Sequence, residues 1–257
     1  MNIPTRVWLC AGLGAIAAIT AGCGGASTPE GGDRIFVAGP WPDTGEHAVY
    51  RLFDRGVDGE GRCETTTGTP TNGVLRLQER CTRDEFGDEG FVDVEAATLA
   101  PIRSERVISN TKDDKQVTHT VVYDDATATF STDDGSDRRE TTRELPRATE
   151  DHPDPAWYDD KSLFWLIRGI ALESGYEATY IYVINAGQPR ILPVDVRVEG
   201  KETVEVPAGT FTAWKVRVER DNTVFFLWVN SEGNREVVQA RIESWNYELI
   251  EYSATSQ

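Results

Sequence analysis

The sequence predicts a mainly β fold, an antiparallel meander with one short amphipathic helix. The clearest strand signal is Val194 to Glu199, where apolar and charged residues alternate without a break, so that one face is buried and the other is wet. The alternation resumes in Thr203 to Val206, turns at Pro207-Ala208-Gly209 and returns in Trp214 to Glu219. This pattern predicts a β-hairpin, and further turn signals separate other segments of strand length.

One segment has the period of a helix instead. Its apolar residues fall on one helical face: Leu163, Leu166, Ile167 and Ile170. The acidic residues Asp159 and Asp160 precede them, and carboxylates favour a helix N-terminus. A single short amphipathic helix beside a large sheet is expected to pack across the concave face of the sheet.

The N-terminus has the features of an export signal. Arg6 is followed by an apolar run from Val7 to Ile19, which is too short to span a bilayer as a permanent helix. The run ends in Thr20-Ala21-Gly22-Cys23, which resembles the lipobox of bacterial lipoproteins. The resemblance implies cleavage before Cys23 and attachment of diacylglycerol and palmitate to that residue. The alternative is an ordinary secretory peptide in which the cysteine is incidental.

Three regions follow from this signal. We expect a lipoprotein signal peptide in residues 1–22, a flexible lipidated tether in residues 23–34 and a single β-rich domain in residues 35–257. The expected location is the cell envelope, including the periplasm, with the protein anchored to the outer face of a membrane by its lipid. The sequence leaves open whether this is the cell membrane or an outer membrane.

The chain is strongly acidic. Its formal net charge is −17, and removal of residues 1–22, whose one charged residue is Arg6, would make it −18. This charge argues against nucleic acid and against anionic lipid headgroups as electrostatic partners. We expect a monomer whose contact with the membrane is through the lipid anchor.

Two further cysteines, Cys63 and Cys81, are expected to form a disulfide, which the exported compartment permits. The segment Thr71-Asn72-Gly73 between them reads as a three-residue hairpin loop that would pair Pro70 with Val74. Paired residue numbers would then sum to 144, as 63 and 81 do, so the two sulfurs would face each other across the hairpin. We interpret this disulfide as structural.

The second half of the chain resembles a family of exported bacterial proteins, domain of unknown function 3108. The resemblance rests on Gly200 to Phe211, on Trp214-Lys215-Val216, on Phe226 to Asn230 and on Thr98 to Ile102, with Leu166 to Arg168 after the helix start. It covers about residues 98 to 243 and implies one curved antiparallel sheet or half-open barrel. That fold would be similar to the periplasmic lipoprotein carriers (LolA/LolB-like). The disulfide hairpin would then be an addition to the family pattern.

No catalytic constellation is visible in the sequence. The three histidines are scattered singly, none at metal-ligand spacing from another. Ser109 to Lys112 matches a Ser-x-x-Lys motif, but the accompanying Lys-Thr-Gly strand is missing. Paired aspartates such as Asp133-Asp134 do not fit a calcium-binding loop. We therefore expect no enzyme activity, no metal and no cofactor.

Aromatic residues on neighbouring strands leave two functions open. Between helix and sheet they could form a filled core, or an apolar cleft that binds an apolar small molecule or a lipid. The residues expected to line such a cleft are Leu163, Leu166, Ile167, Tyr180, Tyr182, Trp214, Phe226 and Trp228. We expect a non-catalytic binding module, and the alternative is a structural or partner-binding envelope lipoprotein with a filled core.

Overall fold

The computed structural model describes residues 32–54, 60–150 and 156–254. The predicted signal peptide, Cys23 and most of the predicted tether lie outside the described residues, so export and acylation stay predictions. Among the described residues, no helix has the length and apolarity that crossing a membrane requires.

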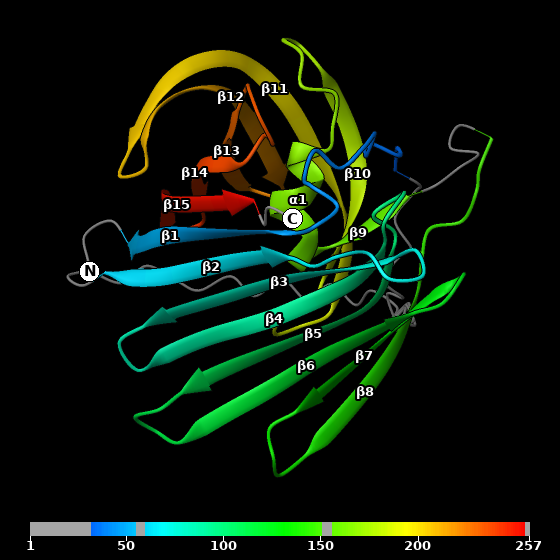
Figure 1. Ribbon diagram of the computed structural model, residues 1–257. Helices are drawn as coiled ribbons and strands as arrows, with labels where there is room; N and C mark the ends of the chain where they lie inside the picture. The colour runs from blue at the N-terminus through cyan, green and yellow to red at the C-terminus, as the bar shows by residue number, and fades with distance from the viewer. Residues whose placement is uncertain (1–31, 55–59, 151–155, 255–257) are drawn as a thin grey trace, which may run out of the picture.

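The described strands form one sheet, so the predicted mainly β fold class is confirmed (Figure 1). Fifteen strands lie in the order β8-β7-β6-β5-β4-β3-β2-β1-β15-β14-β13-β12-β11-β10-β9. The strands of the first half are β1 (Glu46–Asp54), β2 (Gly61–Thr67), β3 (Val74–Arg83), β4 (Phe86–Glu95), β5 (Pro101–Asn110), β6 (Lys115–Tyr123), β7 (Thr127–Asp133) and β8 (Arg138–Glu144). Those of the second half are β9 (Trp157–Asp159), β10 (Glu177–Ile184), β11 (Arg190–Val206), β12 (Gly209–Arg220), β13 (Thr223–Asn230), β14 (Val237–Ile242) and β15 (Trp245–Ala254).

The strand order is that of two antiparallel meanders joined at one seam. Neighbours in the sheet are neighbours in sequence, except that β1 pairs with β15 and so joins the two halves. Short turns allow antiparallel pairing, whereas β9 and β10 pair in parallel because the helical segment lies between them in sequence. The two strands at the ends of the sheet are β8 and β9.

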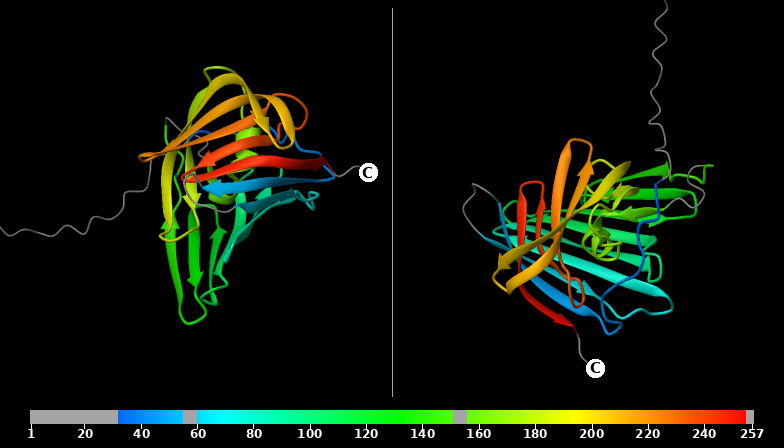
Figure 2. Two further views of the ribbon diagram at one scale, coloured as in Figure 1. Left: turned by 90° about the vertical axis from the view of Figure 1, so that its left-hand side faces the viewer. Right: turned by 90° about the horizontal axis from the view of Figure 1, so that it is seen from above.

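The sheet curls back on itself (Figure 2). Its β9–β10 end packs against β5, β6 and β7 through side chains, and the described strands form no backbone ladder there. Val121 and Phe130, from β6 and β7, pack in one buried cluster with Val183 of β10. Nearby, the Asn185 side-chain amide donates a hydrogen bond to Ser104 Oγ of β5 over 3.0 Å. The result is a half-open barrel with a packed interior.

The helical segment lies inside this curl, as predicted for the concave face (Figure 1). A 3₁₀ turn, η1 (Asp160–Ser162), leads into α1 (Leu163–Arg168), and the Asp159 carboxylate caps it by accepting a hydrogen bond from the Lys161 backbone N–H at 2.9 Å. The expected amphipathic character is not found, because all six residues of α1 are buried. The curled sheet and the segment before β1, whose Val37 N–H donates to Gly169 O, bury the short helix, and Arg168 is buried in an ion pair with Glu46.

The β2–β3 hairpin has the predicted register and a different turn. Cys63 pairs with Cys81, and the two form a disulfide. The turn pairs Thr71 with Val74, not Pro70 with Val74, because both Asn72 (φ 53°) and Gly73 (φ 78°) have positive φ. That is the signature of a two-residue turn whose twist matches that of a hairpin.

The predicted β11–β12 hairpin is also present, and its tip folds back onto the sheet. Its register shifts between Val198 and Gly200, which marks a β-bulge. Beyond the bulge, the Ala208 backbone N–H donates to Leu249 O of β15 at 2.9 Å, and Val206 is buried. The long hairpin therefore covers part of the core.

The domain begins earlier than predicted. Gly32 to Arg34 were expected to belong to the tether, but the Asp33 backbone N–H donates to Thr179 O of β10 at 2.7 Å. A Cβ added at Gly32 would lie 2.7 Å from Ile181 N, so only glycine fits this approach. Ile35 follows directly and is 2% exposed. The last residues of the predicted tether are thus part of the fold, because they lie along β10.

Candidate ligand cavity

A cavity of about 370 Å³ opens at the end of the curled sheet that carries the β3–β4, β10–β11, β12–β13 and β14–β15 turns. This volume lies within the range of small-molecule sites. Eight elements, α1 and seven strands, supply its apolar lining, which consists of Leu52, Cys81, Phe86, Leu163, Phe164, Tyr182, Ile184, Phe225, Ile242, Trp245 and Tyr247.

Strand alternation explains why these side chains point inward. Along β13, Phe225 lines the cavity, so Leu227 shares its face and Phe226 lies on the opposite face. The helix contributes Leu163 and Phe164, and the Phe164 ring packs edge-on against Tyr247 with ring centroids 5.4 Å apart. The start of α1 therefore forms one wall of the cavity.

A chain of charges that are buried or partly buried forms a second wall. The Lys161 ammonium donates to Glu79 Oε2 at 2.9 Å and to Asp88 Oδ1 at 3.2 Å, and it is 5% exposed. Arg106 binds Asp88 with two hydrogen bonds, the one from Nε measuring 2.9 Å, and lies 3.5 Å from Asp160. Strands β3, β4 and β5 thus hold the start of the helical segment by charge as well as by packing.

The ion pairs shift the pKa values of Asp88 and Lys161 toward their charged forms. Burial alone would raise the pKa of Asp88, but Lys161 and Arg106 outweigh it and hold the pKa below its usual value. Burial would lower the pKa of Lys161, but Glu79 and Asp88 raise it. Because each charge faces an opposite charge, the wall is polar and nearly neutral.

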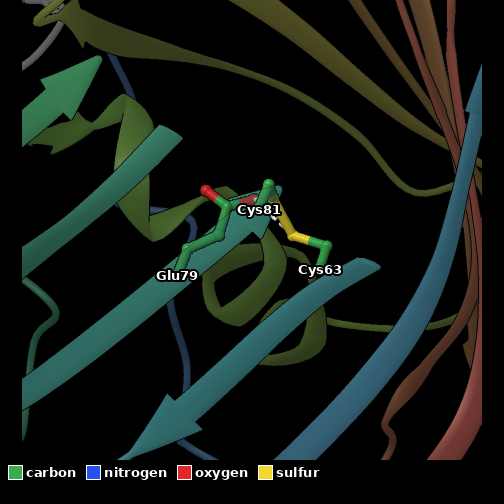
Figure 3. Close-up of side chains that lie close together, drawn as sticks. All are labelled: Cys63, Glu79 and Cys81. Atoms are coloured by element: carbon green, nitrogen blue, oxygen red, sulfur yellow. Dashed lines mark hydrogen bonds between the residues drawn. A yellow bond between two sulfur atoms is a disulfide. The ribbon is translucent and has the colours of Figure 1, made fainter. Parts of the chain in front are cut away.

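The disulfide borders this wall (Figure 3). Glu79 Oε1 lies 3.6 Å from the sulfur of Cys63 and 3.6 Å from that of Cys81. Two sulfurs and a carboxylate at such spacing would suit a metal ion, but metals bind the thiolate, and here each sulfur is bonded to the other. In this form the group is a structural cross-link.

A buried acid lies where the β9–β10 end of the sheet packs against β6. Tyr123 Oη of β6 donates to Asp159 Oδ2 at 2.5 Å, and the side chain of Asp159 is fully enclosed. Burial, together with the neighbouring Asp160 carboxylate, raises the pKa of Asp159 to about 7. This carboxyl therefore titrates near neutral pH at that contact.

The residues predicted for an apolar cleft fall into three places. Leu163 and Tyr182 line the cavity. Leu166, Ile167 and Tyr180 are fully buried in the filled core next to it. The other three lie apart from the cavity lining: Phe226 and Trp228 on the opposite face of β13, and Trp214 beneath the Lys201 ammonium at 4.6 Å.

The charged wall was missed by sequence reasoning, although a signal for it exists. Alternate positions of β3 share one face of the sheet, and these positions are Leu75, Leu77, Glu79 and Cys81. Because Cys81 forms the disulfide, the register of the hairpin already places Glu79 on the same inward face. Lys161 gives no such signal, because its partners are distant in sequence.

A second hollow, of about 420 Å³, lies beside Asp33 and β10–β12. Its lining includes Arg197 and Glu177, which pair on the surface with both side chains more than half exposed. It lies on the outer face of β11, since Arg197 alternates with the buried Val196 and Val198. We therefore take the inner cavity as the candidate site.

Residues 65–246 match a protein family described as a protein of unknown function (DUF3108). The match begins in β2, so Cys81 and all of β3 lie within it, and the disulfide hairpin is not wholly an addition to the family pattern. Neither the curated proteins nor the solved structures contain a match to this chain.

Proposed function

Since the chain belongs to the DUF3108 family, whose function is unknown, we propose a function from its cavity: a non-catalytic module that binds an amphiphilic small molecule outside the cytoplasm. The observation that carries the proposal is an open cavity with an apolar wall on α1 and β13 and a charged wall on β3 and β4. Such pockets bind ligands that have an apolar body and a few polar groups.

The arrangement of charges supports binding without catalysis. The side chains that shape the charged wall are bound to one another or to nearby carboxylates, so the charges of Lys161, Arg106 and Asp88 are already paired. His119 interacts with these charges; it lies against Thr132 at 3.0 Å, and burial together with the charge of Arg106 lowers its pKa.

The alternative, a structural or partner-binding protein, draws support from the filled part of the interior. Between the helix and the sheet, three side chains are fully buried in the core: Leu166, Ile167 and Tyr180. On this alternative, the cavity would be a packing defect that holds only water.

Titration with a neutral apolar fluorophore, N-phenyl-1-naphthylamine, separates the two functions. The sample is the full chain carrying Cys23→Ala, so that no acyl group on that sulfur can compete. The binding function predicts saturable binding at one site per chain, with quenching of tryptophan emission because Trp245 lines the cavity. Fluorescence that rises without saturation would support the structural alternative.

The membrane anchor is part of the proposal. Acylation at Cys23 would hold the binding domain at the outer face of a membrane, at the cell membrane or an outer membrane. Metabolic labelling with a clickable palmitate analogue tests this, with label expected on the parent chain and none on Cys23→Ala. Equal labelling of both chains, or of neither, would contradict it.

A further inference from the structure

Two guanidinium groups at the cavity mouth are held by weak ion pairs. Among the described residues, Arg220 makes one side-chain hydrogen bond, to Glu243 at 2.7 Å, and Arg190 makes one, to Asp221 at 3.1 Å. The carboxylate partners Glu243 and Asp221 are 56% and 59% exposed, whereas the side chains of Arg220 and Arg190 are 13% and 48% exposed. The Arg190–Asp221 pair is exposed on both sides and contributes about 1 kcal/mol at most. A guanidinium has five N–H donors, so both arginines keep donors for a ligand.

The charges deeper in the cavity are less available to a ligand. Lys161 and Arg106 are already bound to carboxylates at the buried wall, so an anionic group there would displace a buried partner. A cationic group at the mouth would meet two guanidinium groups, and the Glu243 and Asp221 carboxylates there are already bound to them. The charge distribution therefore favours an anion at the mouth and an apolar group inside.

The arginines also stand at the border between the apolar wall and solvent. The Arg220 guanidinium lies 4.9 Å from the centroid of the Phe225 ring, which lines the cavity. Arg190 lies on the same side of β11 as the buried Val194, and its side chain is 48% exposed. An amphiphile whose chain lay against Phe225 would bring its head group to these two side chains.

We infer that the cavity binds an aliphatic monocarboxylate, with its apolar chain between α1 and β13–β15 and its carboxylate on Arg190 and Arg220. This inference rests on the proposed binding function. Arginine suits the role because its planar fork matches a carboxylate. The net charge of −17 opposes an anion at a distance, but salt at physiological concentration screens that repulsion beyond about 8 Å.

Calorimetric titration of the full Cys23→Ala chain at pH 8 with decanoate, decanol and decylamine tests the head group. Decanoate should bind about tenfold more tightly than decanol, since a hydrogen bond to a charged group is stronger than one to a neutral group, and decylamine should bind most weakly. Equal affinity for decanoate and decanol would overturn the inference and leave the binding function standing. Failure of all three ligands to bind would contradict both the carboxylate inference and the proposed binding function.

Arg190→Gln and Arg220→Gln then test the assigned residues. Each should weaken decanoate binding about tenfold and leave decanol binding unchanged. Arg197→Gln is the matched control, because Arg197 is on the same strand as Arg190 and on its other face, and it should change neither affinity. Arg190 is the more exposed of the pair, so its variant keeps the test valid if Arg220→Gln impairs folding. Equal losses for both ligands would overturn the assignment.

Discussion

Replacing Arg168 by Met is expected to lower the free energy of unfolding by about 3–5 kcal/mol. Arg168 ends α1 and binds both carboxylate oxygens of Glu46 in β1, and its Nη2 also donates to Asn234 O at 2.8 Å. Glu46 is 5% exposed. The variant would leave this carboxylate buried with only the hydroxyl groups of Thr67 and Tyr252 as donors.

Urea denaturation at pH 7, followed by tryptophan fluorescence, measures this loss. Arg197→Met is the matched control, because its partner Glu177 is exposed, and the change should be within about 1 kcal/mol. The double variant Glu46→Leu, Arg168→Met should be more stable than Arg168→Met, since no unpaired charge remains. A double variant as unstable as the single one would show that packing, not charge, causes the loss.

Replacing Asp159 by Asn is expected to change how stability depends on pH. The folded pKa, about 7, lies above the ordinary value of 3.8, so folding favours the protonated carboxyl. This contribution is fully present below about pH 4 and is lost as pH rises through 7, at no more than roughly 1.4 kcal/mol per pH unit. The variant has no carboxyl to ionise at this position, so it does not lose this stability as the pH rises. At pH 8 its free energy of unfolding should therefore be higher than that of the parent by on the order of 2–4 kcal/mol.

Denaturation midpoints of both chains between pH 5 and 8 test this expectation. Asn can still accept from the Lys161 backbone N–H and face Tyr123 Oη. Asp88 and His119, whose pKa values are lowered, titrate in both chains, so the difference reports on the pair Asp159 and Asp160. Parallel pH profiles for the two chains would contradict the assignment.

Local features were predictable from sequence. The β11–β12 hairpin follows from alternation and a turn, both set by adjacent residues. The pairing of Cys63 with Cys81 follows from the constant sum of paired residue numbers in an antiparallel hairpin. The turn at Asn72-Gly73 differs by one residue from the predicted turn, and the pairing of the cysteines is unchanged. Strand pairing between neighbours in sequence needs no other information.

Features that depend on distant segments were not predictable. The seam between β1 and β15 joins opposite ends of the described chain. In Thr223 to Val229 both faces are apolar, so alternation alone could not tell that Phe225 lines the cavity and Phe226 does not. Lys161 suits the polar face of an exposed helix, and only the curl of the sheet brings Glu79 and Asp88 to it.

The most direct test of ligand binding is to block the cavity mouth and repeat the neutral-fluorophore titration. Ala186 lines the mouth and is partly exposed, so Ala186→Trp adds an indole there without removing core packing. Ser136→Trp adds the same group to the exposed β7–β8 turn as a control. A cavity that binds ligand predicts an apparent Kd at least about tenfold higher for Ala186→Trp than for the parent and Ser136→Trp. The same Kd in all three chains would contradict it.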